Sequence, residues 1–193
     1  MKKDILTTVL IMLLFFVGLS PAFAGPTTSQ EYDRANKMFA QGKFKDAIAL
    51  YQAVLSSPSS DIAPGILYTR IGDGYFRLGD YSNARDAYRG ALKDEKSTEC
   101  AQNQYWIGFC CLMQGKDAEA VSEFLKIPER YPSEGMWVGT AYYWAARACE
   151  RMGRKDQAAE LYRKAGGNGK STQERFALKK AENVNKGQAA SSK

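Results

Sequence analysis

The sequence predicts an all-α protein made of about four helical hairpins in a row. A glycine recurs four times at nearly even spacing, as Gly42, Gly79, Gly115 and Gly153, at intervals of 37, 36 and 38 residues. An alanine stands five residues after each of these glycines, and an aromatic residue stands nine after it. Apolar residues on both sides of each glycine have the spacing of a helix. A fixed period of this length is typical of repeat proteins whose units stack on one another.

The clearest hairpin covers residues 66 to 92. Its two apolar stripes are Ile71, Tyr75 and Leu78 before the turn, and Tyr81, Ala84, Ala87, Tyr88 and Ala91 after it. Gly79 lies between the stripes and can adopt the left-handed conformation that closes a helix. We therefore expect two antiparallel helices joined by a tight turn, and the same design in the other three units.

Three sets of residues keep fixed offsets from the turn glycines. They are the alanines Ala47, Ala84, Ala120 and Ala158, the aromatics Tyr51, Tyr88, Phe124 and Tyr162, and small residues seven positions before the turn, Ala35, Gly72, Gly108 and Ala146. A small residue is needed where the two helices of a hairpin touch, and a bulky one where a hairpin packs on its neighbour. All three sets are therefore expected to be interior.

This pattern resembles the tetratricopeptide repeat, in which a small residue and an aromatic precede a G-[DK]-[YF]-x-x-A segment that is followed by another aromatic. The second unit matches best, and the likeness covers roughly residues 29 to 166. Cys111 and Cys149 stand where the family has a tyrosine. The resemblance implies a right-handed α-solenoid of about four hairpins whose first helices line a concave, protein-binding groove.

The N-terminus predicts export. Two lysines follow Met1, residues 5 to 19 are almost entirely apolar, and residues 21 to 24 end in a small-x-small pattern, so we expect a signal peptide over 1–24 that is cleaved after Ala24. The apolar run is shorter than the ~20 residues that span a bilayer. A periplasmic or secreted protein follows, attached to a membrane peripherally at most.

The remaining segments follow in order. Residues 25–28 form a leader, 29–169 the solenoid, 170–184 a capping helix and 185–193 a disordered tail. Thr28 or Ser29 is expected to cap the first helix, and the spacing of Ser171 and Glu174 predicts a capping box for the last one. Pro64 suits the first turn of a helix, whereas Pro128 should kink or end one.

The polar composition excludes several functions. The chain has no histidine, which removes a common general base and zinc ligand. Its net charge of +6 is spread over helices with alternating signs, so nucleic-acid binding is not expected. No carboxylate pair or nucleophile with a base stands out. Asp73 and Glu150 are the only acidic candidates on the groove, so we expect no enzyme, no metal and no cofactor.

Four cysteines leave two alternatives open. Cys111 and Cys149 hold the same position in neighbouring units, so an oxidising compartment would allow a disulfide between them. Parallel helices packed 8 to 10 Å apart often keep the two Cα atoms too far apart for that bond. Free interior thiols are the other reading, and the one that we favour.

The family's groove positions can be placed on this chain one by one. They fall on Tyr32, Asn36, Phe39, Thr69, Asp73, Phe76, Arg77, Gln102, Tyr105, Phe109, Leu112, Met113, Tyr143, Arg147, Glu150 and Arg151. This surface would be aromatic in its middle and basic at one end. It would bind an apolar or amphipathic segment of another envelope protein. The alternative is that these aromatics pack inside the protein.

The groove departs from that of repeat proteins that hold the acidic ends of chaperones. Tyr32 and Asp73 replace a lysine and an asparagine of that clamp, so a chaperone clamp is not expected. Residues 140–153 resemble part of the non-catalytic superhelix of lytic transglycosylases, and Tyr131 with Pro132 resembles repeats of bacterial envelope proteins. These likenesses suggest a bacterial envelope setting, with peptidoglycan as an alternative partner.

Overall fold

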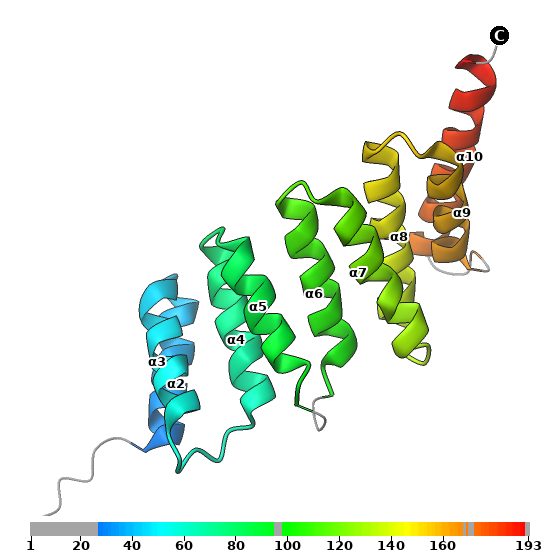
Figure 1. The fold of residues 1–193 in the computed structure, drawn as a ribbon. Helices are drawn as coiled ribbons and strands as arrows, with labels where there is room; N and C mark the ends of the chain where they lie inside the picture. The colour runs from blue at the N-terminus through cyan, green and yellow to red at the C-terminus, as the bar shows by residue number, and fades with distance from the viewer. Residues whose placement is uncertain (1–26, 95–97, 168, 170–171, 192–193) are drawn as a thin grey trace, which may run out of the picture.

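A computed structural model describes residues 27–94, 98–167, 169 and 172–191, which fold into helices joined by turns (Figure 1). Four hairpins and a final helix make up this part of the chain. The helices are α2 (Thr28–Ala40), α3 (Phe44–Ser56), α4 (Pro64–Arg77), α5 (Tyr81–Ala91), α6 (Cys100–Met113), α7 (Asp117–Arg130), α8 (Gly135–Arg151), α9 (Lys155–Gly166) and α10 (Thr172–Ser191). The predicted all-α solenoid is confirmed.

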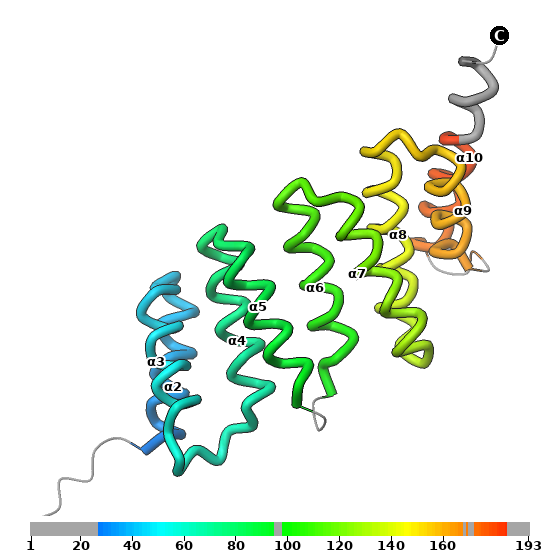
Figure 2. The backbone as a smooth tube through the Cα atoms, in the orientation of Figure 1, coloured from blue at the N-terminus to red at the C-terminus, as the bar shows by residue number. Residues whose placement is uncertain are grey.

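The hairpins stack side by side, so that the chain advances steadily from α2 at one end to α10 at the other (Figure 2). Each helix packs mainly on the helices before and after it in the sequence, and α6 also contacts α8. This arrangement makes the protein a quasi-linear array in which each hairpin depends on its neighbours. The last element, α10, packs on α9 and covers that end of the stack.

The four predicted turns have the same geometry. Their glycines have φ between 73° and 76°, in the left-handed region. In each turn the amide three residues beyond the helix end donates to a carbonyl in its last turn, as Asp80 N does to Tyr75 O at 3.0 Å. This is the hydrogen bond that terminates a helix in the Schellman motif. The sequence therefore identified the turns correctly because this conformation favours glycine.

The interior positions are also as predicted. All four alanines five residues after the turn are fully buried, and the four small residues before it are buried as well. A Cβ atom on Gly72 would lie 2.7 Å from the ring of Tyr88, and one on Gly108 would lie 2.8 Å from Phe124. The rings of Tyr88 and Phe124 thus pack on the small residue of their own hairpin. The Tyr88 ring also meets Trp106 of the next hairpin, as expected.

Several helix ends differ from the prediction. Thr27, and not Thr28 or Ser29, caps α2, and its hydroxyl and Gln30 form a capping box. Helix α7 passes through Pro128 and ends at Arg130, since a proline in the last turn removes only one backbone hydrogen bond. Helix α10 runs to Ser191, past the expected end at 184 and through most of the segment expected to be disordered. The alanines of that segment favour a helix.

Two expectations fall on residues outside the described ranges: the signal peptide over 1–24 and the capping box at Ser171. Within those ranges, none of the helices is long and apolar enough to cross a membrane. Cys110, Cys111 and Cys149 are free thiols in the structure, which therefore contains no Cys111–Cys149 disulfide. Both of these cysteines are buried in the core around α6 and α8.

Candidate protein-binding face

The first helices of the hairpins form one face of the stack, which we call the first-helix face: α2, α4, α6 and α8. A continuous row of aromatic side chains runs over this face from α4 to α10. We call it the aromatic chain, and its members are Phe76, Trp106, Phe109, Trp144, Tyr143 and Phe176. The first five are half-buried, and Phe176 is 51% exposed. The row therefore combines mutual support with accessible ring surface.

Neighbouring rings in this row are in contact. The ring centroids of Phe76 and Trp106 are 5.1 Å apart, and those of Phe109 and Trp144 are 4.9 Å apart at an interplanar angle of 88°. Tyr143 continues the row to Phe176 at 6.2 Å. Edge-to-face and tilted pairs at such distances are favourable beyond the area that they bury. The rings are thus held in place before any partner arrives, which lowers the entropy cost of binding.

Two tryptophans of the aromatic chain were not among the predicted site residues. Trp106 and Trp144 each stand nine residues before a turn glycine, so they occupy the same position in the third and fourth hairpins. The first two hairpins have Asp33 and Arg70 there. A tryptophan repeated at an outward position of two units was the signal that would have found them.

The first two hairpins use the same face differently. The hydroxyl of Tyr51 donates to Asn36 Oδ1 at 2.7 Å, and that of Tyr88 donates to Asp73 Oδ1 at 2.8 Å. Burial raises the pKa of Tyr51 to about 12 and also raises that of Tyr88. The two groove candidates Asn36 and Asp73 are therefore engaged inside their own hairpins. The fourth hairpin has a related bond, from Tyr162 to Glu150 at 2.7 Å.

Asp73 is an acidic residue of this face whose pKa is shifted by its surroundings. Burial raises its pKa, and the hydrogen bond from Tyr88 and the charge of Arg70, 3.6 Å away, only partly offset that effect. Burial penalises the charged form of a carboxyl group. Asp73 and Glu150 do not form a carboxylate pair, because Asp73 is on α4 of the second hairpin and Glu150 is on α8 of the fourth. No group of residues in the described segments could hold a metal ion.

Burial corrects three of the predicted groove positions. Tyr105 is only 8% exposed and packs between Phe124 and Trp137, at ring distances of 5.7 and 5.3 Å. Its pKa is raised to about 12 by that burial. Thr69 and Leu112 are interior as well. Residues one position apart on a helix differ by about 100° in direction, so Trp106 faces out where Tyr105 was expected to.

The remaining candidates at the N-terminal end are partly accessible. Tyr32 lies against Tyr51 at 5.8 Å, and Phe39 lies against Phe44 at 5.1 Å. Both are partly buried and pack against the hydrophobic cluster that the first two hairpins share. Arg77 is exposed in the last turn of α4. This end of the face therefore offers small, separated contacts and no continuous row.

The two arginines of α8 have distinct environments. The guanidinium group of Arg147 lies over the Trp144 ring, 6.0 Å from its centroid. Arg151 instead bridges to Asp117 on α7, with Nε 3.3 Å from Oδ1, and donates to the carbonyl of Leu112. Arg151 thus fastens α8 to the preceding hairpin, whereas Arg147 adds positive charge beside the aromatic chain.

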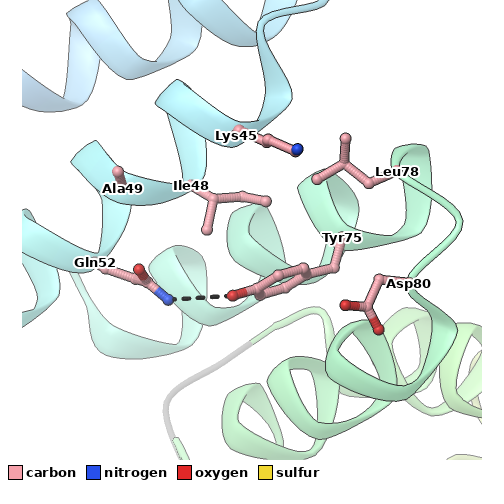
Figure 3. Close-up of a pocket in the computed structure, with 7 residues that line it drawn as sticks. All are labelled: Lys45, Ile48, Ala49, Gln52, Tyr75, Leu78 and Asp80. Atoms are coloured by element: carbon pink, nitrogen blue, oxygen red, sulfur yellow. Dashed lines mark hydrogen bonds between the residues drawn. The ribbon is translucent and has the colours of Figure 1, made fainter.

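A separate pocket of about 450 Å³ lies between α3 and the turn from α4 to α5 (Figure 3). Its walls are Lys45, Ile48, Ala49 and Gln52 from α3, Tyr75 from α4, and Leu78 and Asp80 from the turn. Gln52 donates to the Tyr75 hydroxyl at 3.5 Å across it. Ile48 fits against Gly74, where a Cβ atom would come within 2.6 Å. The pocket is a gap in the contact between the first two hairpins.

The architecture of four glycine-turned hairpins and a capping helix defines a helical repeat protein of the solenoid class. The tetratricopeptide repeat family matches residues 69–134 and again residues 139–165. The chain is a tetratricopeptide repeat protein. Its first hairpin and α10 lie outside the two matched ranges but continue the same stack.

Solved structures of low sequence identity share this fold. The chain superposes on MamA with a TM-score of 0.60 at 20% identity, covering 82% of this chain and 88% of MamA. For YrrB, described as a TPR protein with an unusual peptide-binding site, the TM-score is 0.61 at 19% identity, covering 80% and 75%. For the apo form of RapI it is 0.67 at 14% identity, covering 83% and 64%. At these identities the likeness establishes the fold.

One curated relative is the human protein O-mannosyl-transferase TMTC2, which is 28% identical over 114 residues. The match covers 59% of this chain but only 13% of the relative. The chain thus corresponds to a small part of that protein. Tetratricopeptide solenoids act as scaffolds that present a surface to other proteins.

Proposed function

We propose that this protein is a non-enzymatic scaffold of the bacterial cell envelope that binds a segment of another protein along its aromatic chain. The observation that carries the proposal is the row of contacting, partly exposed rings from four helices. Aromatic residues are enriched at the energetic centres of protein interfaces. A row of this kind fits the apolar side of an extended or helical segment.

The charges around the row support a partner with acidic groups. Arg77 lies at the end of α4 and Arg147 lies over Trp144, so positive charge is present on both α4 and α8. A segment with apolar residues flanked by carboxylates would match both features. YrrB, which shares the fold, is described as binding peptides.

A binding experiment with matched variants tests the proposal. The immobilised chain without residues 1–24 is exposed to an envelope extract beside a Phe109→Ala, Trp144→Ala variant and an Ile66→Ala, Leu78→Ala control. Ile66 and Leu78 are exposed apolar residues outside the aromatic chain. We expect a partner that the wild type and the control retain and that the first variant binds at least about tenfold more weakly. Equal retention by all three would contradict the proposal, provided that circular dichroism shows equal helicity.

The envelope location rests on the N-terminal segment and has its own test. A basic start, a short apolar run and Pro21 to Ala24 are the pattern of a cleaved signal peptide. Expressed in full in a Gram-negative host, the protein should reach the periplasm with Gly25 as its first residue, as read by mass spectrometry. An uncleaved chain in the cytoplasm would refute the envelope part of the proposal and leave the binding part intact.

Peptidoglycan is the second candidate partner. It is favoured by the segment 140–153, which resembles the superhelix of lytic transglycosylases and which places Tyr143 and Trp144 on the aromatic chain. Cosedimentation with purified peptidoglycan that Tyr143→Ala or Arg147→Ala abolishes would favour this alternative. If the chain sediments with peptidoglycan only when a partner protein is also present, the protein-binding function is favoured.

A further inference from the structure

A second cavity lies between the start of α8 and the start of α10. We call it the α8–α10 pocket, and its volume is about 660 Å³, within the range of about 300–1,000 Å³ that ligand pockets have. Its walls include Met136, Gly139, Tyr143 and Trp144 from α8, and Phe176 and Ala177 from α10. Three aromatic rings and a methionine thus surround a space at the C-terminal end of the aromatic chain.

The pocket exists because α10 packs on α9 and leaves α8 largely uncovered. Leu178 of α10 lies against Gly166 at the end of α9, where a Cβ atom would come within 2.5 Å. Between α8 and α10 the rings of Tyr143 and Phe176 meet at 6.2 Å, but Gly139 has no side chain to fill the remaining space. A Cβ atom on Gly139 would meet only the Ala165 carbonyl, at 3.8 Å. The cavity therefore has a small-residue floor and aromatic walls.

Apolar surface is unusually accessible at this pocket. Met136 is 70% exposed and Phe176 is 51% exposed, and both line the cavity. No other large apolar side chain of the described residues is as exposed as these two. Adjacent exposed apolar side chains beside a cavity mark a place where another molecule binds.

A positive charge stands beside the pocket. Arg147 lies over the ring of Trp144, one of the walls, and the neighbouring Tyr143 raises the pKa of its guanidinium group. None of the ion pairs within the described residues includes Arg147, whereas Arg151 one turn later pairs with Asp117. Glu174 lines the opposite wall. A carboxylate of a bound molecule would therefore lie on the α8 side, at Arg147.

We propose that the α8–α10 pocket is the anchor site of the scaffold and takes a bulky apolar side chain of the partner segment, with an adjacent carboxylate bound by Arg147. This inference rests on the proposed function, because it names the part of the partner that the protein recognises. Burying one large side chain in the cavity accounts for a large share of the affinity.

Three short peptides test this recognition directly. They are acetyl-Gly-Trp-Glu-Gly-amide, the same peptide with Gln for Glu, and the same peptide with Ala for Trp. Each is titrated into the isotope-labelled chain while the amide of Gly139 and the indole N–H groups of Trp144 and Trp106 are followed by NMR. We expect the Trp-Glu peptide to bind best, with shifts at Gly139 and Trp144. Loss of Trp should weaken binding about tenfold or more, and loss of the carboxylate about threefold.

Two variants and a control locate the site. Gly139→Leu fills the cavity and replaces a helical glycine, so it should keep the fold and weaken all peptides at least about tenfold. Arg147→Gln should bind the Glu and Gln peptides equally. Ala118→Leu on the exposed side of α7 adds the same side chain elsewhere and should bind like the wild type. Phe176→Ala offers a second way to weaken the pocket.

The remaining outcomes overturn the inference in distinguishable ways. If Gly139→Leu binds the peptides unchanged and Trp106 shifts in place of Trp144, the segment lies elsewhere on the aromatic chain, so the proposed function stands and the anchor site does not. If a disaccharide fragment of peptidoglycan shifts Trp144 and the peptides do not, the pocket is a glycan site. If none of the peptides binds, the anchor is refuted, and the envelope capture experiment decides the proposed function by itself.

Discussion

The first two hairpins and the last two share one scaffold but present different surfaces. Nine residues before the turn, the first pair has Asp33 and Arg70 and the second pair has Trp106 and Trp144. The interior positions are nearly the same in both pairs, with fully buried alanines and large rings on small residues. The difference teaches that a few interior positions define the repeat. The outward positions are thereby free to differ and to carry binding.

At the position nine residues after the turn, only the third hairpin differs from the others, because it has a phenylalanine in place of a tyrosine. The tyrosines of the other hairpins hydrogen-bond to polar groups on their own first helices, whereas the third hairpin has Phe124 and, where Asn36 and Asp73 stand in the first two, Phe109. Replacing a hydrogen-bonded pair by two apolar rings avoids an unpaired buried polar group. The third hairpin is thus the apolar centre from which the aromatic chain extends.

The largest effect is expected where the two halves are alike. Tyr88→Ala and Phe124→Ala each remove a fully buried ring that packs on a glycine of its own hairpin. Each should lower the free energy of unfolding by about 3–5 kcal/mol in urea denaturation followed by circular dichroism. Phe176→Ala, which removes an exposed ring, is the control. A loss under 1 kcal/mol at either buried ring would show that the halves do not share one scaffold.

A smaller effect is expected from the tyrosine hydroxyl groups of the N-terminal half. Tyr88→Phe keeps the ring but leaves the Asp73 carboxyl without its hydrogen bond, so we expect a loss of about 1–3 kcal/mol in the same measurement. Tyr51→Phe deprives the neutral Asn36 and should cost about 1 kcal/mol. If both substitutions are neutral, these hydrogen bonds do not stabilise the first two hairpins.

The arginines that were expected in the groove provide a third comparison. Arg151→Ala removes the bridge to Asp117 and should cost about 1 kcal/mol, because the bridge is partly exposed. Arg77→Ala removes an exposed charge of the N-terminal half and should change stability by less than about 0.5 kcal/mol. Thermal unfolding at low salt measures both. An equal effect of the two substitutions would argue against a fastening role for Arg151.

The smallest effect concerns the charge of Asp73 and depends on pH. Asp73→Asn makes the second hairpin resemble the first, because the Asn36 oxygen accepts from a tyrosine in the same way. Burial raises the pKa of Asp73 above its ordinary value of 3.8, so the carboxyl loses its proton more easily in the unfolded chain. The wild type should therefore lose stability relative to the variant as the pH rises from the pKa of the unfolded chain through the higher pKa of the folded protein. Melting temperatures should agree at pH 3, and the variant should be the more stable at pH 7. A less stable variant at pH 7 would mean that the attraction of Arg70 outweighs burial.

The scaffold could be predicted from the sequence because its interior rules repeat. Gly79 and its three equivalents are recognisable from the conformation that a turn requires. The alanines and rings at fixed offsets gave the interior correctly. Each position occurs in four hairpins, so the pattern can be recognised even where one hairpin departs from it.

The binding face was harder to predict, because it depends on the direction of single side chains. Tyr105 and Trp106 are adjacent, yet Tyr105 is interior and Trp106 belongs to the aromatic chain. The α8–α10 pocket was not predictable, since it depends on how closely α10 approaches α8. That approach follows from three-dimensional packing of Leu178 on Gly166, which has no counterpart in the repeat pattern.

The contacts between neighbouring hairpins also determine how the molecule can deform. Because each hairpin touches mainly the one before and the one after it, a small rotation at one contact is passed on undiminished to everything beyond it. Slight rotations in the same sense add up along the stack and change the separation of its ends by more than any single contact moves. A stack of this kind can therefore change its curvature through small rotations at several contacts while each hairpin stays intact.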